Sequence, residues 1–174
     1  MFPALVRALC IALAMTGATL THAAALDEAQ AQWASGKRDQ AIQTAEAGLK
    51  ATPDDPRLRF ALGTMLLEQQ QLERARVLFV ALTEDFPDLA DPYNNLAVIH
   101  AARGEYEAAR QSLTRALDLQ PDHAQAQENM GDVLMRLAQQ SYERALKQAL
   151  GDDTGLKVKL QRVTAFNNAK TLQR

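Results

Sequence analysis

The sequence predicts an all-α protein built from a repeated pair of antiparallel helices. Three sets of positions recur at a step of 34 residues and hold helix-ending prolines or small residues: Pro53, Pro87 and Pro121; Ala41, Ala75 and Ala109; and Gly63, Ala97 and Gly131. Independent columns that agree on one period indicate an internal repeat. Small residues are expected in such columns because paired helices approach closely only where side-chain bulk is missing. The 5% aromatic content of the 174 residues also favours packed helices over sheets.

The unit at residues 90–121 shows the pattern most clearly. An apolar stripe that includes Leu96 ends at Gly104, and a second stripe that includes Leu113 ends at Pro121. This order predicts a helix, a tight turn, a second helix and a proline stop. The turn of the preceding unit falls at Gln70, so it must form without the conformational freedom of a glycine.

A repeat of this length and pattern resembles the tetratricopeptide repeat (TPR) family. The residues that carry the resemblance are Ala61, Leu62, Gly63, Ala75, Phe79, Pro87, Tyr93, Leu96, Ala97, Gly104, Tyr106, Ala109, Ala116, Leu117 and Pro121. The resemblance implies a right-handed α-solenoid of antiparallel helix pairs. Its units are expected at residues 26–53, 56–87, 90–121 and, in degenerate form, 124–151.

The fourth unit departs from the period after its first half. No Gly or Pro stands where its turn belongs, so we expect one long helix from about His123 to Leu150 that Asp122 caps and Gly151 stops. The alternative is a helix pair with a shifted turn at residues 139–141. Residues 152–174 are predicted to form a loop, a short capping helix and a tail that frays from Asn167. A functional basic tail is the alternative interpretation of that last segment.

Residues 1–25 have the features of a cleaved signal peptide. Arg7 precedes an apolar run over residues 8–15, and the cleavage site is expected among Ala23, Ala24 and Ala25. A TPR domain behind such a signal resembles periplasmic proteins of Gram-negative bacteria. An uncleaved signal that tethers the protein to the membrane is the alternative.

The sequence gives little indication of catalysis. The single cysteine, Cys10, lies in the signal segment, and neither His100 nor His123 has a second His or Cys at a ligand spacing. Phosphate-binding glycine loops and a Gly-x-Ser-x-Gly motif are also absent. We therefore expect no enzyme activity, no cofactor and no metal site.

The family resemblance implies that the first helix of each pair lines a concave groove that binds peptides. Helical spacing then predicts a partner-binding groove made of Trp33, Phe60, Thr64, Leu67, Asn94, Val98, Ala101, Asp132 and Met135. Trp33 and Phe60 have the alternative of packing between repeats. Part of the family clamps a C-terminal carboxylate with Lys, Asn and Arg, but Glu128 and Asp132 stand at two of the corresponding positions. A clamp of that kind is not expected here.

The sequence favours an interaction protein. We expect a scaffold that binds a segment of another protein of the cell envelope. Two alternatives stay open: a self-assembling structural envelope protein, in which copies associate, and an accessory subunit of a cell-wall enzyme. The net charge of −2 provides no basic field for binding nucleic acid.

Overall fold

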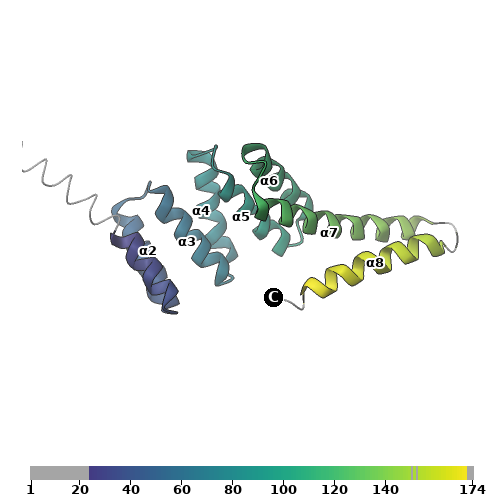
Figure 1. The fold of residues 1–174 in the computed structure, drawn as a ribbon, viewed down its shortest axis with the longest axis horizontal. Coiled ribbons are helices and arrows are strands. Elements are labelled where there is room, and N and C mark those ends of the chain that lie inside the picture. The colour runs from purple at the N-terminus through teal and green to yellow at the C-terminus, as the bar shows by residue number, and fades with distance from the viewer. Residues whose placement is uncertain (1–23, 150, 152, 172–174) are drawn as a thin grey trace, which may run out of the picture. The chain divides into compact units, whose positions relative to one another are not determined.

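The structure is a computed structural model that describes residues 24–149, 151 and 153–171. This part of the chain is helical and contains no strand, which confirms the predicted all-α fold. A helical segment at residues 24–34 is followed by α2 (Arg38–Ala51), α3 (Pro56–Glu68), α4 (Leu72–Asp85), α5 (Ala90–Ala102), α6 (Tyr106–Leu119), α7 (Ala124–Gln148) and α8 (Thr154–Thr171) (Figure 1). The predicted signal segment lies outside the described residues, apart from its last two positions.

The chain forms two compact units that divide between Phe86 and Pro87. In the N-terminal unit, α3 packs on α2 and α4. Its core contains the fully buried side chains of Leu58, Leu66 and Phe79. Gly63 lets α3 and α4 approach, because a Cβ atom at this position would lie only 2.9 Å from the Phe79 ring.

Helix starts and turns of this unit follow the local sequence. The Asp55 carboxylate caps α3 by accepting hydrogen bonds from the backbone N–H groups of Arg57 and Leu58. The turn between α3 and α4 places Gln70 in the left-handed region, with φ of 58°. The turn does form without glycine, although a non-glycine residue in the left-handed region costs a small amount of free energy.

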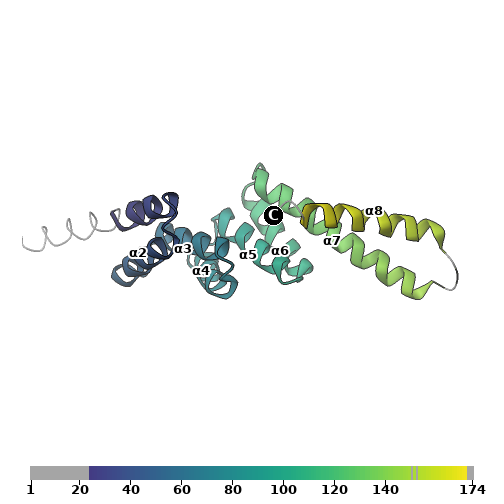
Figure 2. The same cartoon turned by 90° about the horizontal axis from the view of Figure 1, so that it is seen from below.

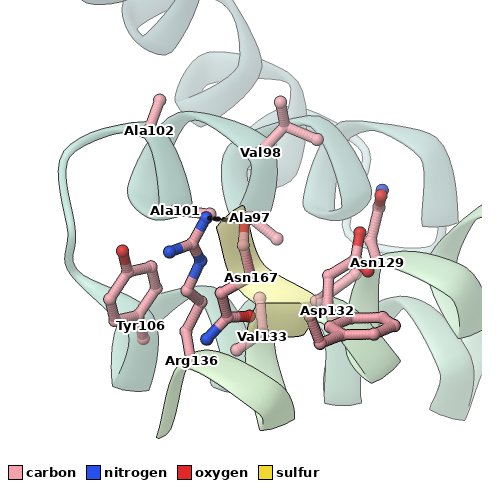
Figure 3. Close-up of a pocket in the computed structure, with 12 residues that line it drawn as sticks. Ala97, Val98, Ala101, Ala102, Tyr106, Asn129, Asp132, Val133, Arg136 and Asn167 are labelled. Carbon is pink, nitrogen blue, oxygen red and sulfur yellow. Dashed lines mark hydrogen bonds between the residues drawn. The ribbon is translucent and has the colours of Figure 1, made fainter. Parts of the chain in front are cut away.

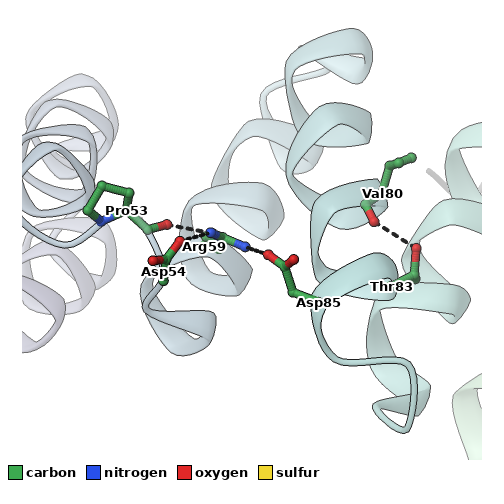
Figure 4. A network of polar contacts seen from close by, with 6 residues as sticks. All are labelled: Pro53, Asp54, Arg59, Val80, Thr83 and Asp85. Atoms are coloured by element: carbon green, nitrogen blue, oxygen red, sulfur yellow. Dashed lines mark hydrogen bonds and ion pairs between the residues drawn. The ribbon is translucent and has the colours of Figure 1, made fainter.

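Arg59 connects the start of α3 to the end of α4 (Figure 4). Arg59 is only 9% exposed. The guanidinium donates from Nε to the Pro53 carbonyl oxygen at 2.6 Å, from Nη2 to Asp54 at 2.8 Å, and from Nη1 to Asp85. One side chain therefore joins the connector, the first helix and the second helix of this repeat.

In the C-terminal unit, α6 packs on both α5 and α7. The core between them consists of small and branched residues, among them Ala97, Ala109, Leu113 and Val133. This is the layered arrangement that the small-residue columns predict.

The fourth unit is one uninterrupted helix, α7, of 25 residues, as the absence of a breaker predicts. Its cap is His123 and not the predicted Asp122: the His123 Nδ1 atom accepts a hydrogen bond from the Ala126 N–H at 3.3 Å. The imidazole can do so because its other nitrogen, Nε2, lies 3.0 Å from the Asp91 carboxylate on α5. The cap therefore also ties α7 to α5.

The C-terminal helix is longer than predicted. α8 begins at Thr154, where a loop was expected, because the Asp153 carboxylate accepts from the Leu156 N–H at 2.8 Å and caps the helix ahead of Gly155. It continues to Thr171, so the predicted fraying from Asn167 is wrong for residues 167–171. α8 folds back along α7 in an antiparallel hairpin, which both views show (Figures 1 and 2).

Candidate functional site

A cavity of about 120 Å³ lies within the C-terminal unit and is lined by residues of α5, α6, α7 and α8. We call it the groove cavity. Its lining consists of small apolar residues with a few polar groups: Ala97, Val98, Ala101, Ala102, Tyr106, Leu113, Asn129, Asp132, Val133, Arg136, Phe166 and Asn167 (Figure 3). A concave site of mixed lining is the usual form of a binding site for a partner side chain or a small molecule.

The elements of the repeat create the space. α5 contributes Val98 and Ala101 to the lining, α6 contributes Tyr106 and Leu113, and α7 contributes Asp132, Val133 and Arg136. The alanines leave room that a larger side chain would fill. The cavity therefore follows from the same small-residue pattern that lets the helices pack.

Two asparagines at neighbouring repeats organise one end of the cavity. The Asn129 Nδ2 group donates to Asn94 Oδ1 at 2.9 Å, and Asn94 is only 6% exposed. Asn94 thus holds Asn129, and it is Asn129 that lines the cavity beside Asp132 (Figure 3).

The other side of the cavity belongs to α8, which Asn167 fixes to α7. Asn167 is 3% exposed. Its side-chain Nδ2 group donates to Gln139 Oε1 at 2.7 Å and to the Met135 carbonyl oxygen at 3.4 Å, and its backbone carbonyl oxygen accepts from Arg136 Nη2 at 3.3 Å. These contacts of a buried residue give α8 a defined register on α7.

The structure brings together three of the nine predicted groove residues, since Val98, Ala101 and Asp132 line the cavity. Asn94 supports the lining from behind, and Met135 takes part through its backbone carbonyl. Sequence reasoning missed several lining residues: Tyr106, Asn129, Arg136, Phe166 and Asn167. The spacing of four between Asp132 and Arg136 on one helix face was the signal available for Arg136.

The other four predicted residues lie in the N-terminal unit: Trp33, Phe60, Thr64 and Leu67. The first three make contacts within this unit. The Phe60 ring packs edge-on against Phe79 with centroids 5.8 Å apart, and the Thr64 hydroxyl donates to the Phe60 carbonyl oxygen. The Arg38 guanidinium lies 4.1 Å from the centroid of the Trp33 ring. Leu67 is half-buried. The Phe60 ring therefore packs within its own repeat, and not between repeats as the alternative had it.

Residues 24–149 and 153–171 hold no group of three or more His, Cys, Asp or Glu side chains that could bind a metal ion. No helix in the described part of the chain is both long and apolar enough to cross a bilayer.

Comparison with known proteins identifies the repeat. Family models described as tetratricopeptide repeat match residues 26–90 and 90–123, which together cover more than half of the chain. The chain belongs to the tetratricopeptide repeat family. The resemblance drawn from the 34-residue columns is confirmed.

Curated relatives match over a small part of their length. The chain is 34% identical over 111 residues to the protein O-mannosyl-transferase TMTC1 of mouse, and this match covers 60% of the chain but 12% of the mouse protein. The human TMTC1 is 32% identical over 96 residues, which are 53% of the chain and 11% of that protein. The chain therefore spans about an eighth of the curated relatives that it matches.

Solved structures share the fold. The first TPR of Spaghetti (RPAP3) bound to the HSP90 peptide SRMEEVD superposes with a TM-score of 0.64 at 19% identity, over 67% of this chain and 93% of that one. YrrB, a TPR protein with an unusual peptide-binding site, gives a TM-score of 0.58 at 26% identity, over 62% and 55% of the two chains.

Proposed function

We propose that the chain is a non-enzymatic scaffold that binds a segment of another protein in the groove cavity of its C-terminal unit. The observation that carries the proposal is the cavity itself, a concave site that the helices α5 and α7 line together with α6 and α8, and whose lining combines apolar and polar side chains. Peptide binding by RPAP3 and YrrB, which share the fold, supports it.

Capture of partners by crosslinking tests this proposal. Val98→Asp replaces an apolar group of the cavity lining by a carboxylate and should abolish capture of a specific partner, because an apolar partner group would have to desolvate that charge. Val77→Asp is the matched control, since Val77 lies on α4 of the N-terminal unit and is 61% exposed. Equal capture by both variants, each folded by circular dichroism, would place the partner site outside the cavity.

We also propose that the scaffold works in the bacterial periplasm after cleavage of residues 1–25. Arg7, the apolar run at residues 8–15 and the small residues Ala23–Ala25 support this location. Expression with the native N-terminus in a Gram-negative host should place the protein in the osmotic-shock fraction, and its intact mass should show a chain that begins just after one of these alanines. A full-length mass in the membrane fraction would support the tethered alternative.

A second candidate function is self-assembly, and an exposed surface of α7 at Gly131 and Leu134 favours it. Gly131 has no atom within 4 Å of an added Cβ, and Leu134 is 49% exposed. Exposed apolar helix faces promote association. Sedimentation at increasing concentration decides: a dimer that Leu134→Asp dissociates would support this function, and a concentration-independent monomer would remove it.

A further inference from the structure

The C-terminal helix contributes directly to the cavity. Phe166, on α8, lines the cavity, and it precedes Asn167, the residue that fixes α8 to α7. Phe166 is 48% exposed although it lines the cavity, so part of its ring is accessible to a partner. Burial on a partner would account for this exposure.

We infer that the groove cavity is a socket for one uncharged, branched aliphatic side chain of an extended partner segment, and that Phe166 determines this preference. This inference rests on the proposed function and specifies its ligand. α8 is then a wall of the binding site as well as a cap of the repeat array.

The size of the cavity favours a single side chain. Its volume of about 120 Å³ is somewhat below that of an engineered protein cavity of about 150 Å³ that binds benzene. A leucine or isoleucine side chain fits such a volume, whereas a tryptophan does not. The floor made by Ala97, Ala101 and Val133, with Phe166 at the side, supplies apolar contact.

The charges of the lining favour a neutral occupant. Asp132 and Arg136 carry opposite charges four positions apart on α7, and the formal charge of the lining is therefore zero. A lysine or glutamate placed in the cavity would meet one like charge together with one opposite charge, and removing its own charge from water is unfavourable. Asn129 and Tyr106 add amide and hydroxyl groups that can bond the peptide groups on either side of the anchoring residue.

The same charges distinguish this site from one that binds an acidic tail. The peptide bound by the RPAP3 neighbour, SRMEEVD, ends in an acidic run. Acidic side chains are held best by cationic groups, and the lining of the groove cavity has one guanidinium and one carboxylate. We therefore expect no affinity for that peptide.

Capped single amino acids test the socket directly. N-acetyl-leucine-N-methylamide, with a peptide group on each side of its side chain, is titrated into the full chain and followed by amide NMR. We expect saturable shifts at Val98, Ala101 and Asp132. The alanine probe should bind about tenfold more weakly, because it fills less of the cavity. Glutamate and lysine probes and the SRMEEVD peptide should leave these signals unchanged. Equal binding of all probes, or no binding of the leucine probe, would overturn the inference.

Variants of α8 test the role of Phe166. Phe166→Ala should weaken binding of the leucine probe about tenfold, and Phe166→Leu should largely restore it, since an apolar wall returns. Val158→Ala is the matched control, because Val158 is an exposed apolar residue of the same helix that does not line the cavity. Unchanged binding by Phe166→Ala would contradict its role.

The two proposals fail in different ways. If Val98→Asp keeps its captured partner, the proposed function itself is wrong. If Val98→Asp loses the partner while Phe166→Ala keeps it at full affinity, the groove binds partners and the inference about the socket is wrong.

Discussion

At the scale of single residues, two glycines at equivalent repeat positions have opposite surroundings. A Cβ atom at Gly63 would lie 2.9 Å from the buried Phe79 ring, whereas a Cβ atom at Gly131 would meet nothing within 4 Å. Gly63→Ala should destabilise the protein, because overpacking costs about 1–3 kcal/mol and exceeds the helical gain. Gly131→Ala should stabilise it by up to about 1 kcal/mol through helix propensity alone. Urea unfolding of both variants checks this, and a shift of the same sign in both would contradict it.

The second residue-scale prediction concerns Arg59, the buried guanidinium of the N-terminal unit. Arg59→Met keeps the apolar stem but removes the bonds to Pro53, Asp54 and Asp85. Because the two carboxylates can be rehydrated, we expect a loss of only about 1–2 kcal/mol in the free energy of unfolding. Arg57→Met is the control, since the Arg57 side chain is 71% exposed. An equal effect of the two changes would mean that the Arg59 contacts do not stabilise the repeat.

At the scale of helices, the N-terminus of α7 depends on an unusual cap. Histidine is not a favoured N-cap residue, yet the His123 Nδ1 atom accepts the Ala126 N–H. His123→Ala should destabilise the C-terminal unit by about 1 kcal/mol, and His123→Asn should recover most of this because asparagine caps well. Thermal unfolding of the two variants measures the difference. Identical losses would show that the Asp91 contact, and not the cap, is what matters.

α8 provides the second prediction at this scale. Asn167→Ala leaves Gln139 Oε1 and the Met135 carbonyl without this donor, so α8 should detach from α7 more often. We expect amide hydrogen exchange in α8 to become at least about fivefold faster, which corresponds to about 1 kcal/mol. Asn168→Ala is the matched control, because Asn168 is exposed. Unchanged exchange in the Asn167 variant would show that apolar packing alone holds α8.

The helices that sequence reasoning placed correctly are those with local signals. The repeat columns located α3 to α6, and the missing breaker predicted an unbroken α7. The length of α8 was underestimated at both ends. Its start was missed because the local cap by Asp153 stands just ahead of a glycine, and its end was missed because it depends on Asn167 reaching α7. Contacts that join distant parts of the chain leave no periodic signal in the sequence.

The same distinction explains the site. Val98, Ala101 and Asp132 were predictable because the family resemblance assigns the first helices to a groove and helical spacing then places these residues on its side. Phe166 and Asn167 were not, since they reach the cavity only when α8 folds back along α7. Asn94 was predicted as a ligand group, but it is bonded to Asn129, a pairing across repeats that sequence spacing did not reveal.

At the scale of the whole molecule, the division into two compact units suggests how the chain unfolds. In repeat proteins, stability is approximately a sum of terms within repeats and between neighbours, so a local change has a local effect. The chain carries a single tryptophan, Trp33, which lies in the N-terminal unit. Its fluorescence therefore reports on that unit, whereas circular dichroism reports on all helices.

A core substitution in the C-terminal unit makes this testable. Leu113 is fully buried, so Leu113→Ala should destabilise that unit by about 2–5 kcal/mol. We expect the unfolding transition followed by circular dichroism to broaden and to start at a lower urea concentration. The urea midpoint of the transition followed by Trp33 fluorescence should move little. Leu62→Ala, in the N-terminal core, is the reciprocal control and should move the fluorescence midpoint. If both variants shifted both signals equally, the chain would unfold as one cooperative body, and a partner bound at the groove cavity would then stabilise every repeat by the same free energy.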